Sequence, residues 1–405
     1  MAAPGILYFH PEADWARHTA FRTQVLDQIS FMESLGYECS LLVGYQRGEH
    51  DSARYLEDHL SGSLYLTERP LSGHFVNVYR HARSSFNRFR QQFKQMKNFA
   101  VYYRNFITFS ATRGAFHRIE VPTVFDFRGV PMSEAAFRRG RNPWYLPYLD
   151  RLYGEIGFRA DRTLCVSQAM ADWLESKTGK RVTGIVPSCG DKERFFVDFQ
   201  KRGEARKQLG WSEDDVVFFF AGAAWKWQRI NDLLRFFKHL ERQHPRCRLL
   251  ALISEDAAAQ SIRDQLRSLG ISENRYAVFS SLPDDVPFWL NAADYGVIFR
   301  HDHLVNRVAS PIKLAEYLLT GLPVIASPHI GDVSDLIERY ELGVIVTESA
   351  IQQSFDGIEF NVVPTSISER LRIREIAARH FDRSAHADVY RRLYGELGIN
   401  PGSDA

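Results

Sequence analysis

Short apolar runs alternate along this chain with longer segments in which apolar residues recur at helical spacing. In the C-terminal half we predict strands at 216–221, 248–254, 275–280, 295–299 and 323–327, and helices at 230–243, 257–269, 285–292 and 311–319. In the N-terminal half we predict strands at 5–10, 38–43, 123–127, 163–167 and 180–186, and helices at 14–35 and 168–176. Strands that alternate with helices of this length are typical of parallel sheets covered on both faces. The pattern predicts an α/β fold.

The same pattern predicts more than one domain. A chain of 405 residues exceeds what one hydrophobic core usually supports. The stretch 187–210 is polar, charged and poorly periodic, and is predicted to be a linker. The last helical pattern, 368–397, is rich in Arg. We therefore expect a first domain of residues 1–195, a second domain of residues 196–367, and C-terminal helices in residues 368–405 that pack back on the first domain.

The composition indicates which cellular compartment and which classes of partner the protein is expected to have. The net charge of +2 argues against a dedicated nucleic-acid coat. The longest apolar run, 216–224, is too short to span a bilayer, which needs about 20 residues. The first residues lack the cationic segment and cleavage site of a signal peptide. The four cysteines are scattered, which excludes a disulfide framework or a zinc cluster. We expect a cytoplasmic protein.

The segment that opens at Ser310 carries the most chemical information. Ser310 is a favoured N-cap residue and the following proline is favoured at the first helical position. A helix N-terminus offers free N–H groups and a positive dipole end, which together bind anions such as a diphosphate. Lys313 adds a cation in the first turn, and the Glu316 carboxylate can accept hydroxyl groups on the same rim. A capped helix with solvated Lys and Glu side chains is the alternative.

Residues 310–325 read Ser-Pro-x-Lys-x-x-Glu-Tyr-Leu-x-x-Gly-Leu-Pro-Val-Ile, which closely resembles the donor-binding motif of GT-B glycosyltransferases of family 4. Further stretches resemble that family in the same order, at 160–167, 186–195, 218–222 and 290–298. The resemblance covers about residues 120 to 395. It implies two Rossmann-like domains facing a cleft, and retaining transfer of a sugar from a nucleotide diphosphate sugar to a hydroxyl acceptor. No cofactor and no metal are implied.

The resemblance also implies roles for individual residues. Glu316 matches the second Glu of the Glu-x7-Glu pattern, which binds the nucleotide ribose, whereas the position of the first Glu is Val308. Recognition of the sugar hydroxyls is therefore expected elsewhere on the loop before the motif. The candidates there are His301, Asp302 and Asn306.

The phosphate-facing cations of the family are also displaced in this chain. Lys226 or Arg229, on the loop after the strand 216–221, and Arg307 are the candidates for that role. We expect no metal site, because the pairs Asp214–Asp215 and Asp284–Asp285 are typical of turns or helix caps. Two histidines, His301 and His303, are a weak signal for zinc.

In the N-terminal half, Asp126 and Arg128 lie at the C-terminal end of the predicted strand 123–127. Ligands of open α/β sheets bind outside the carboxyl ends of strands. The resemblance implies a polar residue near the reacting carbon at this place, so Asp126 and Arg128 are candidates for catalysis. A structural salt bridge between them is the alternative. The glycine-rich loop of the family is not apparent after the first strand, where His10 begins a polar stretch.

A basic and aromatic segment lies between Arg69 and Ile119. It contains ten Lys or Arg, eleven Phe or Tyr, and no acidic residue. Such a segment suits an anionic membrane surface, a polyanionic glycan or a lipid diphosphate, and less so a nucleic acid. The alternative is a solvated basic helix whose aromatic residues pack into the core. The residues chosen for acceptor or membrane contact are Arg88, Arg90, Lys94 and Lys97.

Together these features favour a glycosyltransferase of surface polysaccharide, lipopolysaccharide or capsule synthesis. We expect its partners to be a nucleotide-sugar donor, a glycan or lipid-linked acceptor and the inner face of the plasma membrane, and not a nucleic acid. A nucleotide-sugar 2-epimerase and a catalytically inactive sugar-nucleotide-binding partner are the rival interpretations.

Overall fold

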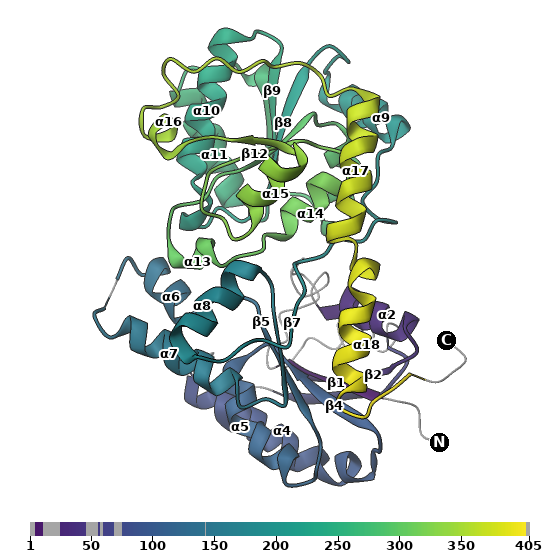
Figure 1. Ribbon diagram of the computed structural model, residues 1–405. Coiled ribbons are helices and arrows are strands. Elements are labelled where there is room, and N and C mark those ends of the chain that lie inside the picture. The colour runs from purple at the N-terminus through teal and green to yellow at the C-terminus, as the bar shows by residue number, and fades with distance from the viewer. Residues whose placement is uncertain are drawn as a thin grey trace. The chain divides into compact units, whose positions relative to one another are not determined.

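The computed structural model describes residues 5–10, 25–45, 56, 60–68, 75–141 and 143–401. The chain divides into two compact units, which are visible in Figure 1. The N-terminal unit comprises residues 1–187 and 386–405, and the C-terminal unit comprises residues 188–385. The main division therefore falls at residue 187 and not at the expected residue 195.

The N-terminal unit is built on a parallel sheet of seven strands in the order β3-β2-β1-β4-β5-β6-β7. The strands are β1 (Gly5–His10), β2 (Glu38–Tyr45), β3 (Leu64–Glu68), β4 (Phe99–Tyr103), β5 (Thr123–Phe127), β6 (Arg162–Cys165) and β7 (Gly184–Ile185). The helices are α2 (Asp27–Ser34), α4 (Phe75–Gln95), α5 (Phe106–His117), α6 (Pro131–Arg138), α7 (Leu146–Gly157), α8 (Gln168–Thr178) and α18 (Ala387–Gly395). The strand order reverses between β1 and β4, which is where Rossmann-like sheets bind ligands.

The C-terminal unit repeats this topology with six parallel strands in the order β10-β9-β8-β11-β12-β13. The strands are β8 (Val216–Gly222), β9 (Cys247–Ile253), β10 (Tyr276–Phe279), β11 (Tyr295–Ile298), β12 (Val324–Ala326) and β13 (Gly343–Ile345). The helices are α9 (Phe199–Leu209), α10 (Ile230–Gln243), α11 (Asp256–Ser268), α12 (Val286–Asn291), α13 (Leu304–Arg307), α14 (Ile312–Leu319), α15 (Val333–Tyr340), α16 (Glu348–Gln352) and α17 (Ile367–Phe381). The prediction of two Rossmann-like parallel α/β domains is confirmed.

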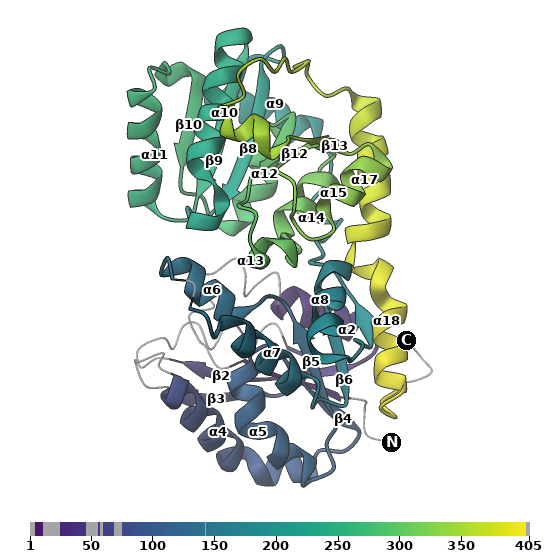
Figure 2. The ribbon, with the colours of Figure 1, turned by 60° about the vertical axis from the view of Figure 1, so that its left-hand side comes forward.

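Helices cover both faces of the C-terminal sheet, as Figure 2 shows. Alternate residues of β8 enter different cores because successive side chains of a strand point to opposite faces. Val217 and Phe219 join a core with Tyr317 of α14, whereas Phe218 packs in a second core with Phe236 of α10. A strand buried on both faces reads as a continuous apolar run, which is why β8 was predictable.

The predicted linker at 187–210 is wrong over its second half, where α9 lies. Asp198 caps this helix by accepting from the backbone N–H of Lys201 at 3.0 Å, and Gly210 ends it in the left-handed region at φ 69°. The buried face of α9 consists of Arg202, Ala205 and Arg206. Apolar periodicity could not reveal this helix because two of its three buried residues are arginines.

The prediction that residues 368–405 all pack back on the first domain is also wrong. The single expected helix is two helices, α17 and α18, and only residues 386–405 belong to the N-terminal unit. α17 remains in the C-terminal unit because Ile373, Ala377 and Phe381 are buried in the core that contains Leu314 of α14.

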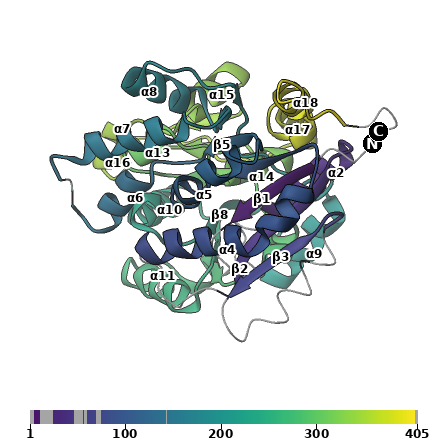
Figure 3. The same ribbon diagram turned by 90° about the horizontal axis from the view of Figure 1, so that it is seen from below.

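β3 directly precedes the basic and aromatic segment and β4 lies within it, and neither strand was predicted. β4 is buried along its whole length. Figure 3 shows α4 and α5 next to the N-terminal sheet. Arg69 and residues 14–24 of the expected helix 14–35 lie outside the described residues, and the helix that the structure describes there is α2, Asp27–Ser34.

Candidate functional site

The strand order of the C-terminal unit reverses between β8 and β11, so the loops that follow these two strands meet at the switch point. β8 ends at Gly222, whose φ of 138° is accessible to glycine and strained for other residues. A Cβ atom at this glycine would lie 3.3 Å from the Nζ of Lys313. The backbone of β8 therefore approaches the first turn of α14 closely.

A single side chain locks α14 against the sheet. The Tyr317 hydroxyl accepts a hydrogen bond of 3.0 Å from the backbone N–H of Ala221, at the end of β8. The ring lies on the backbone of β11 at Gly296, where a Cβ atom would come within 2.1 Å of it. The first turn of α14 is thus fixed beside the carboxyl ends of both central strands.

Lys313 is a buried cation in this first turn, with only 6% of its surface exposed. Its Nζ donates to the Oε1 of Gln228 at 3.0 Å and lies 4.1 Å from the centroid of the Phe220 ring. Burial, assisted by the positive charge of Arg300 and partly opposed by Glu316, holds the pKa of Lys313 well below its usual value. A buried ammonium group of this kind gains free energy when an anion binds next to it.

Glu316 lies one turn after Lys313 on the same helix, and it is 6% exposed. Residues three apart on a helix share a face, so the carboxylate and the ammonium group lie along one side of α14. The structure thereby brings together the two residues that the sequence placed at the centre of the site.

Ser310 has a different role from the one predicted. Its hydroxyl accepts a hydrogen bond of 2.9 Å from the backbone N–H of Ser188. The helix begins at Ile312 with Pro311 at the N-cap position, and no side chain caps it. The prediction of Ser310 as the capping residue is therefore wrong, and the first N–H groups of α14 are left without a side-chain cap.

A network of charges surrounds Asp126 in the N-terminal unit. This side chain is fully buried on β5, and it accepts hydrogen bonds from the Tyr102 hydroxyl, from Arg104 Nε at 3.2 Å and from Arg128 Nε at 2.5 Å. Burial raises the pKa of Asp126, but the two arginines, with the Tyr102 hydrogen bond, outweigh burial and hold that pKa below its usual value. Burial and the nearby carboxylate raise the pKa of Tyr102 to about 12.

Asp126 and Arg128 form the salt bridge that the alternative interpretation predicted. Two other atoms of the network could still form hydrogen bonds. Among the described residues, neither Oδ1 of Asp126 nor Nη1 of Arg104 has a hydrogen-bond partner, although both atoms are buried. A buried polar atom without a partner is costly. One acceptor and one donor, placed where β4 and β5 end, suit a ligand that both donates and accepts, such as a hydroxyl group.

Comparison with known proteins identifies the C-terminal unit. Residues 201–372 match the protein-family model described as "Glycosyl transferases group 1". The chain carries a group 1 glycosyltransferase domain. The matched region contains β8, α14 and the whole switch point described above. A search of curated protein sequences gives no significant match.

Solved structures share the fold of the whole chain at low sequence identity. Sucrose-phosphate synthase from Thermosynechococcus elongatus has a TM-score of 0.69 at 14% identity, over 98% of this chain and 99% of that one. HepE from Anabaena, solved with UDP and glucose, has a TM-score of 0.67 at 16% identity, over 98% and 99%. WaaG, described as a glycosyltransferase of lipopolysaccharide biosynthesis, has a TM-score of 0.60 at 15% identity, over 98% and 100%. These likenesses establish a GT-B fold, and glycosyltransferase is the enzyme class that the comparisons support.

Two of the candidate cations of the glycosyltransferase are engaged by carboxylates. Arg229 is buried at a φ of 47°, and its Nη1 donates to both oxygens of Glu348, at 2.9 and 2.8 Å, while its Nε donates to Asp232. Arg307 forms a bidentate pair with Asp302, at 2.5 and 2.8 Å. Two predicted ligand-binding residues, Arg307 and Asp302, therefore bind each other.

The other loop candidates differ in burial. Lys226 is exposed on the short helical turn after β8. More than a third of the His301 surface is exposed, but partial desolvation of its ring and the charge of Arg229 lower its pKa. Asn306 is fully buried and donates to the carbonyl of His301 at 2.8 Å, so it shapes the loop. His303 caps α13, and within the described residues no group of His, Cys, Asp and Glu could hold a metal ion.

Sequence reasoning missed the residues that support the site of the glycosyltransferase. Gln228 and Phe220 hold the Lys313 ammonium group, and Arg300 acts on it through its charge. Arg104 completes the Asp126 network. The carboxyl end of a parallel strand was the available signal, because these residues lie in β8 or in the loops that follow β8, β11 and β4.

Proposed function

We propose that this glycosyltransferase takes a UDP-sugar as donor and transfers the sugar to a hydroxyl acceptor with retention of anomeric configuration. The observation that carries the proposal is the buried, carboxylate-flanked Lys313 in the uncapped first turn of α14, at the switch point of the C-terminal sheet. The UDP complexes of HepE support the choice of nucleotide. No cofactor is proposed beyond the donor itself.

The donor diphosphate binds at the first turn of α14 in this proposal. Breaking the bond between the anomeric carbon and the diphosphate oxygen leaves negative charge on the leaving group. Fixed donors in a site with little water stabilise such charge by about 3 to 4 kcal/mol for each well-placed group. Lys313 and the helix N–H groups supply those donors, and Lys226 is a further cation within reach of solvent. Glu316 accepts the ribose hydroxyls.

The acceptor is proposed to bind in the N-terminal unit at the Asp126 network. Oδ1 of Asp126 would accept a hydrogen bond from an acceptor hydroxyl, and Nη1 of Arg104 would donate to its oxygen. Arg128 keeps Asp126 ionised, so Arg128 is a positioning residue in the proposal.

The decisive experiment incubates the purified protein with radiolabelled UDP-glucose, UDP-galactose or UDP-N-acetylglucosamine, with and without a bacterial membrane extract. Label that appears in a lipid or glycan fraction supports transfer. An epimerised nucleotide sugar without any acceptor product would support the 2-epimerase instead. Binding without turnover in every extract would indicate the inactive sugar-nucleotide-binding partner.

Replacing Glu316 by alanine is expected to raise the dissociation constant of UDP by about 10- to 100-fold, which corresponds to the loss of a charged hydrogen-bond pair. Isothermal titration calorimetry measures the change, and uridine serves as a second ligand that retains the ribose. Both ligands should lose affinity to a similar degree. Unchanged binding of UDP would remove Glu316 from the donor site.

A contact with an anionic membrane surface is proposed for the exposed basic residues of α4 and the segment after it. Arg88, Lys94 and Lys97 are exposed, and the fold shared with WaaG, a glycosyltransferase involved in lipopolysaccharide biosynthesis, supports a role at a lipid-linked acceptor. The aromatic residues of this segment pack into the core, with Phe86, Phe93 and Phe116 buried. The proposed contact is therefore electrostatic. Among the described helices, none is long and apolar enough to cross a bilayer.

Reversing Arg88, Lys94 and Lys97 to Glu is expected to lower partition onto phosphatidylglycerol-containing vesicles by at least about 100-fold, because each basic residue near such a surface contributes about 1 kcal/mol. Co-sedimentation measures the bound fraction. Arg90 is left unchanged here because it lines a pocket discussed below.

The matched control makes the same charge change at Arg159, Lys177 and Lys207, which are exposed elsewhere. This control should retain most of the vesicle binding, and UDP binding should be normal in both triple variants. Equal losses of vesicle binding in the two variants would show that the loss depends on net charge and not on the position of the residues. This result would contradict the proposed contact.

A further inference from the structure

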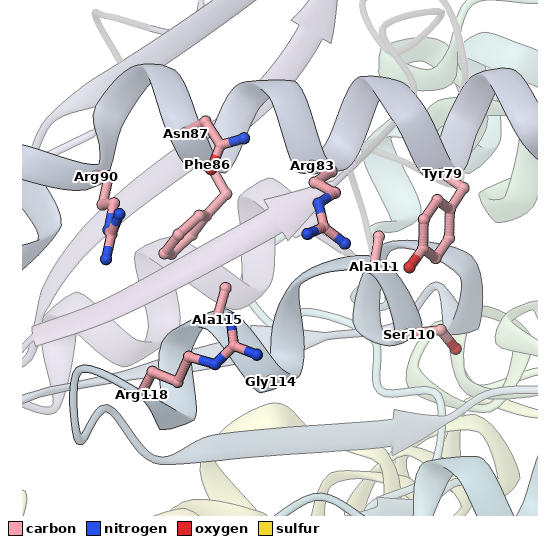
Figure 4. Close-up of a pocket in the computed structure, with 10 residues that line it drawn as sticks. All are labelled: Tyr79, Arg83, Phe86, Asn87, Arg90, Ser110, Ala111, Gly114, Ala115 and Arg118. Atoms are coloured by element: carbon pink, nitrogen blue, oxygen red, sulfur yellow. The ribbon is translucent and has the colours of Figure 1, made fainter.

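A pocket of about 330 Å³ opens between α4 and α5 on the N-terminal unit. α4 contributes Tyr79, Arg83, Phe86, Asn87 and Arg90, and α5 with the residue after it contributes Ser110, Ala111, Gly114, Ala115 and Arg118. Figure 4 shows Tyr79, Arg83 and Arg90 extending from α4 toward α5. None of these residues has been given a role in donor binding or in the Asp126 network.

The pocket exists because α5 presents small side chains where α4 crosses it. Ala111, Gly114 and Ala115 leave space beside the buried ring of Phe86, which packs on Phe116 with ring centroids 4.7 Å apart. A Cβ atom added at Gly114 would meet nothing within 4 Å. The floor of the pocket is thus rigid and apolar, and its rim is open.

The rim concentrates positive charge. Arg83, Arg90 and Arg118 are exposed at its edge, and no carboxylate pairs with any of them among the described residues. The stretch from Arg69 to Ile119 contains no acidic residue that could do so locally. Elsewhere many arginines are paired, as at Arg202, Arg206 and Arg229. Three unpaired guanidinium groups around one cavity repel each other until an anion binds between them.

The composition of the rim also indicates which anion. Guanidinium groups match phosphate oxygens through paired N–H donors. The Asn87 amide adds a neutral donor at the same rim. The Ser110 hydroxyl donates to the carbonyl of Phe106 at 2.7 Å. The volume of about 330 Å³ is at the small end of ligand sites, which suits a headgroup or a phosphorylated sugar and not a polymer.

We propose that the pocket between α4 and α5 binds a phosphate or diphosphate group through Arg83, Arg90 and Arg118. The group belongs either to a soluble phosphorylated ligand or to the headgroup of a lipid. This site is independent of the donor site, since all of its residues lie between positions 79 and 118 and none lies in the group 1 domain.

The first experiment titrates inorganic pyrophosphate into the full chain by calorimetry, with UDP present in excess so that the proposed donor site is occupied. We expect a dissociation constant below about 1 mM, raised at least about tenfold in the double variant Arg83→Ala/Arg118→Ala. A second variant, Gly114→Leu, keeps every charge and fills the open space, and it should lose binding as well. The control is Arg159→Ala, which removes an exposed charge elsewhere on the same unit and should bind normally. UDP binding should be the same in all variants, and this separates a failure here from a failure of the donor proposal.

The second experiment replaces pyrophosphate with phosphatidylcholine vesicles that contain phosphatidic acid. Binding of pyrophosphate that depends on Arg83, Arg118 and Gly114 supports a soluble ligand. Vesicle binding with the same dependence, without pyrophosphate binding, supports a lipid phosphate. If neither probe binds, or if Arg159→Ala weakens binding as much as the double variant, the proposal is overturned.

Discussion

Replacing Lys313 by methionine is expected to raise the dissociation constant of UDP by about 100-fold or more without lowering the melting temperature. The loss of affinity follows because the ammonium group is buried and fixed by Gln228 and Phe220, so no other cation can take its position. Removing one member of a buried charge pair at an interface costs about 2 to 5 kcal/mol. Calorimetric titration with UDP measures the loss.

The stability of this variant follows from the same burial. The pKa of Lys313 is held well below its usual value, mainly by burial, so the unfolded chain binds this proton more tightly than the folded chain does. Stability therefore rises with pH between the lowered pKa and the ordinary lysine value. Methionine has a similar length and carries no charge, so it removes the cost of the buried ammonium group. Thermal unfolding should give a melting temperature equal to or above that of the wild type.

A dependence on pH provides an independent check. A bound diphosphate favours the charged form of Lys313, so UDP binding should take up protons, and affinity should fall as pH rises through the lowered pKa. Calorimetry in buffers of different ionisation enthalpy measures the proton uptake, which should be smaller in Lys313→Met. Lys207→Met, an exposed lysine of the same unit, is the matched control. Wild-type affinity in Lys313→Met would show that the diphosphate does not bind at α14.

The sequence predicted that Lys313 and Glu316 share one helix because this information is local. A helix start, a lysine and a glutamate within seven residues define one turn and one face of α14, and no distant contact is needed to place them. The strand β8 was equally predictable, since a strand buried on both faces is an unbroken apolar run. The parts of the molecule that depend on short-range sequence patterns could therefore be predicted.

The residues that support Lys313 and Asp126 could not be predicted from the sequence, because contacts between distant parts of the chain define them. Gln228 lies 85 positions before Lys313, and Arg104 lies 22 positions before Asp126. The role of Ser310 also depends on a partner 122 residues away, and this contact replaced the capping that its local sequence favours. Local pattern indicates what a residue can do, and the tertiary structure decides which of these interactions forms.

The second large effect is expected at Asp294, far from any proposed ligand. This carboxylate is fully buried and accepts hydrogen bonds from Arg202 at 2.9 Å, Arg206 at 2.7 Å and Arg370 at 3.1 Å. It also accepts from the backbone N–H of Val217 on β8 at 2.9 Å. One side chain therefore joins α9, α17 and the central strand of the C-terminal sheet.

Asp294→Ala is expected to destabilise the C-terminal unit by about 3 to 5 kcal/mol, the usual cost of removing one partner from a buried ion pair. Burial and the nearby Arg202 already lower the pKa of Arg370 to about 10, so the guanidinium groups tolerate little further loss of negative charge. Differential scanning calorimetry with full chains measures the shift of the C-terminal transition. The control is Asp264→Asn, which breaks the exposed pair with Arg267 and should change stability by less than about 0.5 kcal/mol.

The expected route of unfolding distinguishes a loss of charge balance from a loss of packing. α17 is held both by Arg370 and by the apolar residues Ile373, Ala377 and Phe381. If the charge cluster dominates, Asp294→Ala should expose α17 to limited proteolysis before the core melts, and Ile373→Val should not. Early cleavage within α17 in both variants would assign its attachment to apolar packing.

A variant Asp294→Ala with wild-type stability would mean that the backbone carbonyls around Arg202 and Arg206 suffice for these charges. A buried carboxylate among three arginines would then be dispensable, contrary to the cost that burial of an unbalanced charge imposes.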